Sequence, residues 1–81
     1  MSNILMSTMN ADKYQHHYPR VTLKELQHNQ LFRLTDGTMH VYRVLFSKEG
    51  KVYAEVHEGT HEGLACALPD FLYCIKLEYK H

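Results

Sequence analysis

The stretch KVYAEVH, residues 51–57, decides the fold class of this chain. Apolar and polar side chains alternate along it, which is the pattern of a β-strand with one buried face and one exposed face. The apolar face holds Val52, Ala54 and Val56, and the other face holds Lys51, Tyr53, Glu55 and His57. A period of two over seven residues predicts a strand and excludes an amphipathic helix here.

Short strands of similar character are expected on both sides of this stretch. They cover residues 31–34, 41–46, 64–68 and 73–79. The sequence KEG at 48–50 predicts a tight hairpin in which Gly50 takes a positive φ. The run LACAL at 64–68 is apolar throughout, which predicts a strand covered on both faces. Before the first of these strands, TLKE at 22–25 matches a capping box and predicts one turn of helix.

Five short strands and no long helical stripe predict an all-β protein. A flat sheet of this size leaves one apolar face bare, whereas curling into a small antiparallel barrel covers it and shortens the exposed edges. We therefore expect a single small five-stranded β-barrel domain over residues 21–81, with one short helical turn. Residues 1–20 show no clear period and are expected to form an N-terminal leader that is flexible, or that becomes ordered by lying against the body or a partner.

Composition supports one globular domain. The chain has 81 residues, 44% hydrophobic and 22% charged, and its nine Lys+Arg balance its nine Asp+Glu. Zero formal charge removes the usual indication of nucleic-acid or membrane binding. The first residues lack the basic region of a secretory signal, which predicts a cytoplasmic protein with Cys66 and Cys74 as free thiols. A single bridge between these cysteines, which flank a turn, stays an alternative.

The order of these elements resembles a small SH3-like β-barrel. The resemblance is carried by TLKEL at 22–26, LFRL at 31–34, DG at 36–37, YRV at 42–44 and the one-turn break LPDFL at 68–72. The first four of these segments, from TLKEL to YRV, also resemble the opening of many short bacterial and phage barrel proteins. The resemblance implies a five-stranded antiparallel barrel over residues 21–79. The chain has no Trp, so the recognition of Pro-rich peptides by SH3 domains is not implied.

One motif suggests metal chemistry. HEGTH at 57–61 matches the zinc-protease pattern H-E-x-x-H, which needs both histidines on one face of a helix. Here the match begins at a strand end and contains Gly59, so a polar loop is the preferred interpretation. Metal binding through His57 and His61, or through Cys66 and Cys74, stays an alternative, and no enzyme activity or cofactor is expected.

We expect a non-enzymatic module that binds a protein partner through the outward face of residues 41–46 and 51–57. Tyrosine is enriched at such interfaces because it offers a large area and a polar tip. The expected contact residues are Tyr42, Arg43, Tyr53, Glu55 and His57. The resemblance implies a phage or mobile-element protein that inhibits or adapts a host factor, for example an anti-CRISPR inhibitor.

A small RNA- or DNA-binding barrel is the first alternative function. Arg20, Lys24, Arg33 and Arg43 are the cations expected to gather for that role. Residues 31–79 hold five Lys+Arg and seven Asp+Glu, so their net charge of −2 disfavours phosphate binding. Membrane binding is not expected, and a homodimer through unpaired strand edges is a further expectation.

Overall fold

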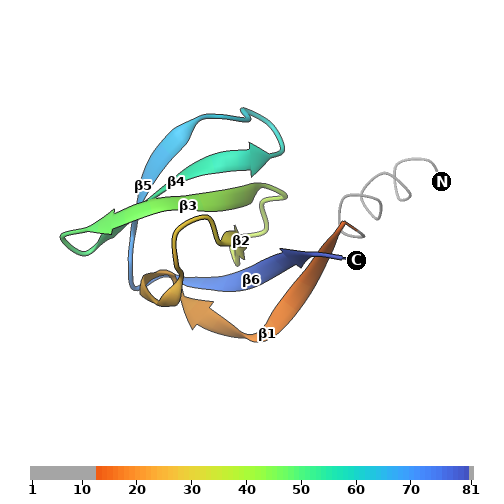
Figure 1. Cartoon of the computed structure of the whole chain (residues 1–81), viewed down its shortest axis with the longest axis horizontal. Helices are drawn as coiled ribbons and strands as arrows, with labels where there is room; N and C mark the ends of the chain where they lie inside the picture. Colours follow the sequence, from red (N-terminus) through yellow and green to blue (C-terminus); the bar gives the residue numbers. More distant parts are fainter. Residues whose placement is uncertain (1–12, 81) are drawn as a thin grey trace.

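The computed structural model describes residues 13–80, which form one antiparallel sheet of six strands. The elements are β1 (Tyr14–Thr22), the 3₁₀ turn η1 (Leu23–Glu25), β2 (Leu31–Leu34), β3 (Val41–Lys48), β4 (Lys51–Glu58), β5 (Ala65–Pro69) and β6 (Tyr73–Tyr79). Their order across the sheet is β1-β6-β2-β3-β4-β5 (Figure 1). The all-β prediction is therefore confirmed.

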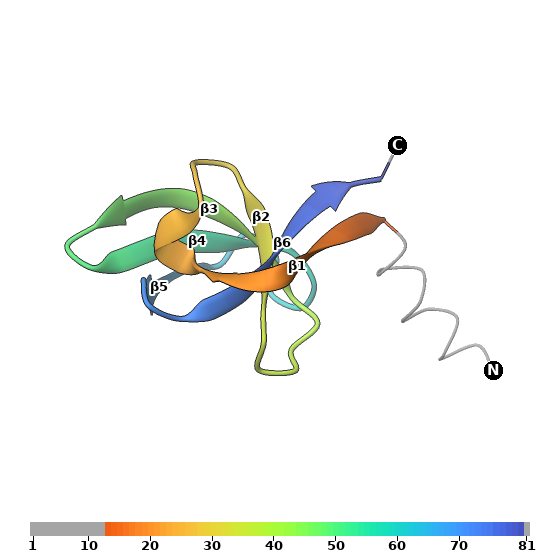
Figure 2. The ribbon, with the colours of Figure 1, turned by 90° about the horizontal axis from the view of Figure 1, so that it is seen from below.

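The sheet is curled but not closed, so the expected closed five-stranded barrel is wrong in both strand number and closure. Strands β1 and β5 are the two edges, and each pairs with a single neighbour. The β3–β4 hairpin extends to one side of the molecule, and the start of β1 and the end of β6 extend to the other (Figure 2). The fold is thus compatible with the small barrel-like architecture while keeping two open edges.

The additional strand is β1, which lies partly in the segment expected to be a leader. It runs antiparallel to β6, from Tyr14 opposite Tyr79 to Thr22 opposite Tyr73. Its sequence YQHHYPRVT has no alternation and contains Pro19, so nothing local indicates a strand. Pairing with β6 and burial of Tyr14, which is 2% exposed, hold it in place. The sheet therefore begins at Tyr14, and residues 1–12 of the expected leader lie outside the described residues.

The main core lies on the face predicted from residues 51–57. Val52, Ala54 and Val56 are all buried in it, as their alternation indicated. Phe32 of β2 is fully buried at its centre. The other buried members are Leu23, Leu26, Tyr42, Val44 and Cys74.

A second, smaller core lies on the opposite face of the sheet. It consists of Tyr14, Leu31, Val41 and Leu77, with Ile75 packed against it. Strand β6 contributes to both cores, because Cys74 points into the main core and Leu77 into the second. The curl of the sheet creates this arrangement, because it brings the start of β1, with Tyr14, over the face that lies opposite the main core.

The position of strand β5 shows that one prediction, the coverage of residues 64–68 on both faces, is wrong. We expected residues 64–68 to be covered on both faces, but β5 is an edge strand in which Ala65 and Ala67 are exposed. Only Cys66 and Leu68 pack against the main core from this strand. Alanine side chains carry little apolar area, so exposing them costs little.

The local turns follow the sequence closely. The amide and the hydroxyl of Thr22 both donate to the Glu25 carboxylate at 2.8 Å, which confirms the carboxylate half of the predicted capping box. The same contacts lower the pKa of Glu25, led by the Thr22 amide. In the β3–β4 hairpin, Glu49 and Gly50 have φ of 51° and 79°, as a tight two-residue turn requires. Among residues 13–80, no helix is both long and apolar enough to cross a membrane.

Candidate functional site

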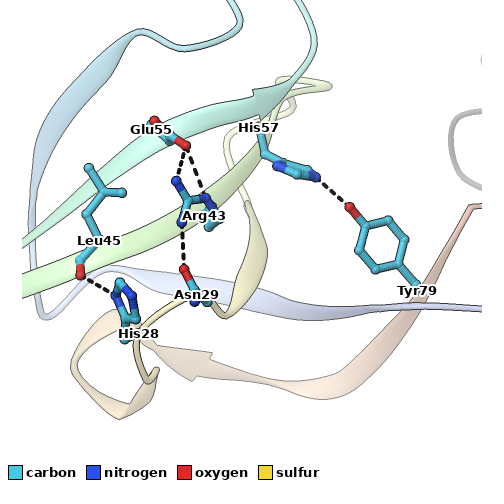
Figure 3. A network of polar contacts seen from close by, with 7 residues as sticks. All are labelled: His28, Asn29, Arg43, Leu45, Glu55, His57 and Tyr79. Carbon is cyan, nitrogen blue, oxygen red and sulfur yellow. Dashed lines mark hydrogen bonds and ion pairs between the residues drawn. The ribbon is translucent and has the colours of Figure 1, made fainter.

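The candidate site is a row of three side-chain contacts on the face of β3 and β4 opposite the main core. We call it the outer face and define it by Arg43, Phe46, Tyr53, Glu55 and His57. From the hairpin tip inward, the row begins with the Phe46–Tyr53 ring stack. It continues with the Arg43–Glu55 ion pair and ends with the bond between His57 and Tyr79 of β6 (Figure 3).

The Arg43–Glu55 pair occupies the middle of the outer face. The two residues are directly opposed in the β3–β4 ladder, and Arg43 Nε donates to Glu55 Oε1 at 3.0 Å. A second guanidinium nitrogen donates to the same oxygen, and a third donates to Asn29 Oδ1 at 2.6 Å (Figure 3). Both side chains are about two-thirds buried, with exposures of 31% and 28%. The Arg43 cation is therefore held in place and its charge is balanced.

A bulge in β3 brings Phe46 to the outer face. The register shifts between Val44 and Phe46, which leaves Leu45 as the extra residue. Without this shift, Phe46 would point into the main core two residues after Val44. The Leu45 carbonyl accepts a hydrogen bond of 2.6 Å from Nδ1 of His28, which satisfies a group near the break in the ladder (Figure 3).

Phe46 and Tyr53 then form a stacked aromatic pair. Their ring centroids lie 4.5 Å apart and their planes differ by 17°. Phe46 is 52% exposed, while Tyr53 is half-buried. Phe46 is not among the contact residues expected from sequence, although the unbroken apolar run Val44-Leu45-Phe46 indicates that alternation fails there. Ala67 of β5 lies opposite Tyr53 and extends the apolar part of this surface.

A second bulge, in β4, positions His57. Val41 pairs with Glu58 and Tyr42 pairs with Val56, so His57 is the residue without a ladder partner. Its Nε2 atom lies 2.6 Å from the Tyr79 hydroxyl, which links β4 to β6 (Figure 3). His57 therefore connects the outer face to β6, the strand that also contributes Leu77 to the second core.

The structure separates Tyr42 from the other expected contact residues. Its ring is 8% exposed and stacks on Phe32 inside the main core, at a centroid distance of 5.2 Å. Residue parity explains this, because Tyr42 pairs with Val56 while Arg43 pairs with Glu55. Of the five expected contact residues, Arg43, Tyr53, Glu55 and His57 therefore share one face, and Tyr42 lies on the other.

Metal and thiol chemistry find little support in this geometry. The HEGTH motif spans the end of β4 and a turn in which Gly59 and His61 have φ of 130° and 68°, so it does not form the required helix. Within the described range, 13–80, there is no group of three or more His, Cys, Asp or Glu residues arranged for a metal. Cys66 and Cys74 are both free, which matches the expected thiols. Burial raises the pKa of both, that of Cys74 to about 11.

Two hollows each include residues of β6 in their lining. The first, of about 400 Å³, lies between residues 27–31 and 77–79, next to the His57–Tyr79 end of the outer face. The second, of about 490 Å³, is lined by residues 34–36 and 71–73. Each lining contains one carboxylate, Glu78 in the first and Asp36 in the second, and the first also contains His28.

Comparisons with protein-family models, with curated proteins and with solved structures found no match to this chain. The outer face and the strand edges are therefore the features of the molecule that indicate what it binds.

Proposed function

We propose that this chain is a non-enzymatic protein-binding module whose contact surface is the outer face of β3 and β4. The observation that carries the proposal is the Phe46–Tyr53 stack, which places a half-exposed phenylalanine on the outer face beside an ordered ion pair. Protein interfaces combine aromatic anchors with a polar rim in this way.

The backbone that exposes Phe46 supports this role. A regular β3 would bury the ring, but the bulge at Leu45 directs it outward and gives up that apolar burial. Bulges occur frequently where a strand re-aims a side chain for function. Stacking against Tyr53 also restricts both rings before any partner arrives, which lowers the entropy cost of binding.

The charges favour a protein partner over a nucleic acid. Of the four cations expected to gather, Arg43 is neutralised by Glu55 and Arg33 bonds Nε2 of His16 at 3.0 Å. Residues 31–79 also carry a net charge of −2. A partner that presents an apolar centre with polar groups around it matches this surface better than a row of phosphates does.

The origin of this protein and the cellular process in which it acts stay predictions. A phage or mobile-element inhibitor of a host factor, including an anti-CRISPR protein, is the narrower form of this proposal and depends on the small-barrel resemblance alone.

Capture from a cell lysate with matched variants tests the proposal. Phe46→Ala removes the exposed ring of the outer face, and Phe71→Ala removes a ring that is 68% exposed elsewhere. We expect a protein that is retained by the wild type and by Phe71→Ala but lost by Phe46→Ala. With that protein purified, calorimetry should show a loss of affinity of about 30-fold for Phe46→Ala, the size of a hot-spot truncation. Equal capture by all three proteins would overturn the proposal.

Nucleic-acid binding is the second candidate, and one observation favours it. The Arg20 guanidinium lies 5.6 Å from the centre of the Tyr73 ring, which is 58% exposed, so a cation and a stacking surface adjoin there. Fluorescence anisotropy with labelled single-stranded and duplex RNA and DNA at low salt tests it. Binding that weakens steeply with salt and is lost in Tyr73→Ala would establish this function in place of the first.

A further inference from the structure

The free edge of β5 exposes a defined set of backbone groups. The Val56 amide donates to the Leu64 carbonyl at 2.9 Å, so Leu64 points its backbone toward β4. Alternate residues of an antiparallel strand point the same way, which places Cys66 and Leu68 on the β4 side. The amides and carbonyls of Ala65 and Ala67 therefore point to the open edge of the sheet.

The sequence of this edge reads the same in both directions. Residues 64–68 are LACAL, with Cys66 at the centre. In an antiparallel pair of two copies related by a two-fold axis at Cys66, each Leu64 lies opposite a Leu68 and each Ala65 opposite an Ala67. This register makes Ala65 and Ala67 the hydrogen-bonded pairs, which are the residues whose backbone groups are free. Sequence symmetry and hydrogen-bond parity thus select the same arrangement.

We propose that the chain forms a symmetric homodimer in which the β5 strands of two copies pair antiparallel about Cys66. Two six-stranded sheets then become one continuous sheet. The interface is isologous, because the same strand is used by both copies and every contact occurs twice. The outer face of each copy stays open, so this inference is independent of the proposed protein-binding function.

The other edge of the sheet differs in the ways that prevent such pairing. Strand β1 contains Pro19, carries the charge of Arg20 and has an irregular register between His17 and Val21. Proline, charge and bulges are the devices that block edge-to-edge association. Between residues 64 and 68, β5 has none of them, and Pro69 stands only at its end.

Side chains at this edge also match a second copy. Leu64 is 59% exposed in the single chain and would pack beside Leu68 of the second copy, which removes apolar area from water. Ala65 and Ala67 are small and uncharged, so opposed copies neither clash nor repel. Because five residues on each side bury less than a standard interface, we expect a dimer weaker than nanomolar.

A pair of double variants tests the register. Positions 65 and 67 lie opposite each other across the proposed two-fold axis, and both side chains are exposed in the single chain. Ala65→Lys with Ala67→Lys places like charges opposite each other and should give a monomer. Ala65→Lys with Ala67→Glu places opposite charges there and should keep the dimer. Sedimentation velocity over a range of concentrations measures the result, and thermal unfolding by circular dichroism confirms that each variant is folded.

Disulfide trapping gives an independent readout in solution. Directly opposed residues of a non-hydrogen-bonded pair have Cα atoms about 4.5 Å apart, within the range that a disulfide spans. In Cys74→Ser, which leaves Cys66 as the single thiol, oxidation with diamide should produce a covalent dimer, and Cys66→Ser should produce none. A wild type that stays monomeric at every concentration, or a dimer that persists in the doubly lysine-substituted variant, would overturn the inference.

Discussion

The hydroxyl of Tyr14 lies 2.5 Å from the Glu58 carboxylate and joins the first strand of the sheet to the end of β4. Three strands separate β1 from β4 in the sheet order, so this bond crosses the curl at the second core. Burial is the main cause that raises the pKa of Tyr14, and the bond to Glu58 adds to it. The same bond is the first cause that lowers the pKa of Glu58. The contact therefore stabilises both the curl and the ionised carboxylate.

Tyr14→Phe should lower the free energy of unfolding by about 1.5–3 kcal/mol at neutral pH, because a hydrogen bond to a charged group is lost while the ring stays. Urea denaturation measures the change. Tyr53→Phe is the matched control, because it also removes one tyrosine hydroxyl but keeps its ring stack with Phe46. Equal effects of the two substitutions would contradict the role of the Tyr14–Glu58 bond.

The same bond predicts a pH dependence of stability. The pKa of Glu58 is held below its ordinary value of 4.5, so its stabilising contribution is present above that pH. It is lost as the pH falls through the lowered pKa of the folded protein. The difference in unfolding free energy between wild type and Tyr14→Phe should therefore shrink in acid. Carboxyl NMR titration should show the pKa of Glu58 rising toward 4.5 in Tyr14→Phe, and an unchanged value would contradict the assignment.

Gly59→Ala should destabilise the fold by about 1–3 kcal/mol. Gly59 has φ of 130°, and an added Cβ would lie 2.8 Å from Cδ2 of His40. Gly37→Ala is the control, since Gly37 has φ of 88° with open space around the added atom. Thermal unfolding should show a larger loss for Gly59→Ala. If the two losses match, the contact with His40 has no energetic effect.

His28→Ala should cost about 1 kcal/mol, because the Leu45 carbonyl at the β3 bulge loses its hydrogen bond from the His28 ring. Gln27→Ala, at the neighbouring exposed position, should have little effect. Chemical denaturation measures both, and backbone NMR shifts around Leu45 show whether the change is local to the bulge. If His28→Ala leaves the free energy of unfolding unchanged, water replaces this hydrogen bond without cost.

The thiol of Cys74 should react only when the protein opens. Its side chain is fully buried, and burial raises its pKa to about 11. In Cys66→Ser, which keeps Cys74 alone, an aromatic disulfide reagent should label the native protein at the slow rate of opening. Denaturation in urea should bring labelling to the rate of a free thiol. Fast labelling of the native protein would place Cys74 outside the main core.

The features that could be predicted from the sequence depend on local patterns. The alternation at 51–57, the positive φ of Gly50 and the Glu25 contacts of the capping box each depend on residues only a few positions apart. Interactions of this short range are readable from neighbouring residues. The outward position of Tyr53, Glu55 and His57 followed from the same alternation.

The features that differ from the expectations depend on contacts between residues far apart in the sequence. Strand β1 exists because β6 lies beside it, and its own sequence resembles a loop. Tyr42 was misplaced because the face of β3 depends on its pairing with β4. Phe46 was overlooked because a single extra residue, Leu45, reverses the parity of the strand beyond it.

The all-β class, the position of the β3–β4 turn and the buried face of residues 51–57 are all readable from the amino-acid sequence, since they follow from the spacing of neighbouring residues. The symmetric run LACAL at 64–68 is also visible in the sequence, although the apolar composition of this run predicts a strand that is buried on both faces. Three features depend on the folded sheet: β1 completes it, β5 lies at its edge, and Phe46 instead of Tyr42 joins the outer face. Strand neighbours and bulges set these features, and both depend on pairing between residues far apart in the chain.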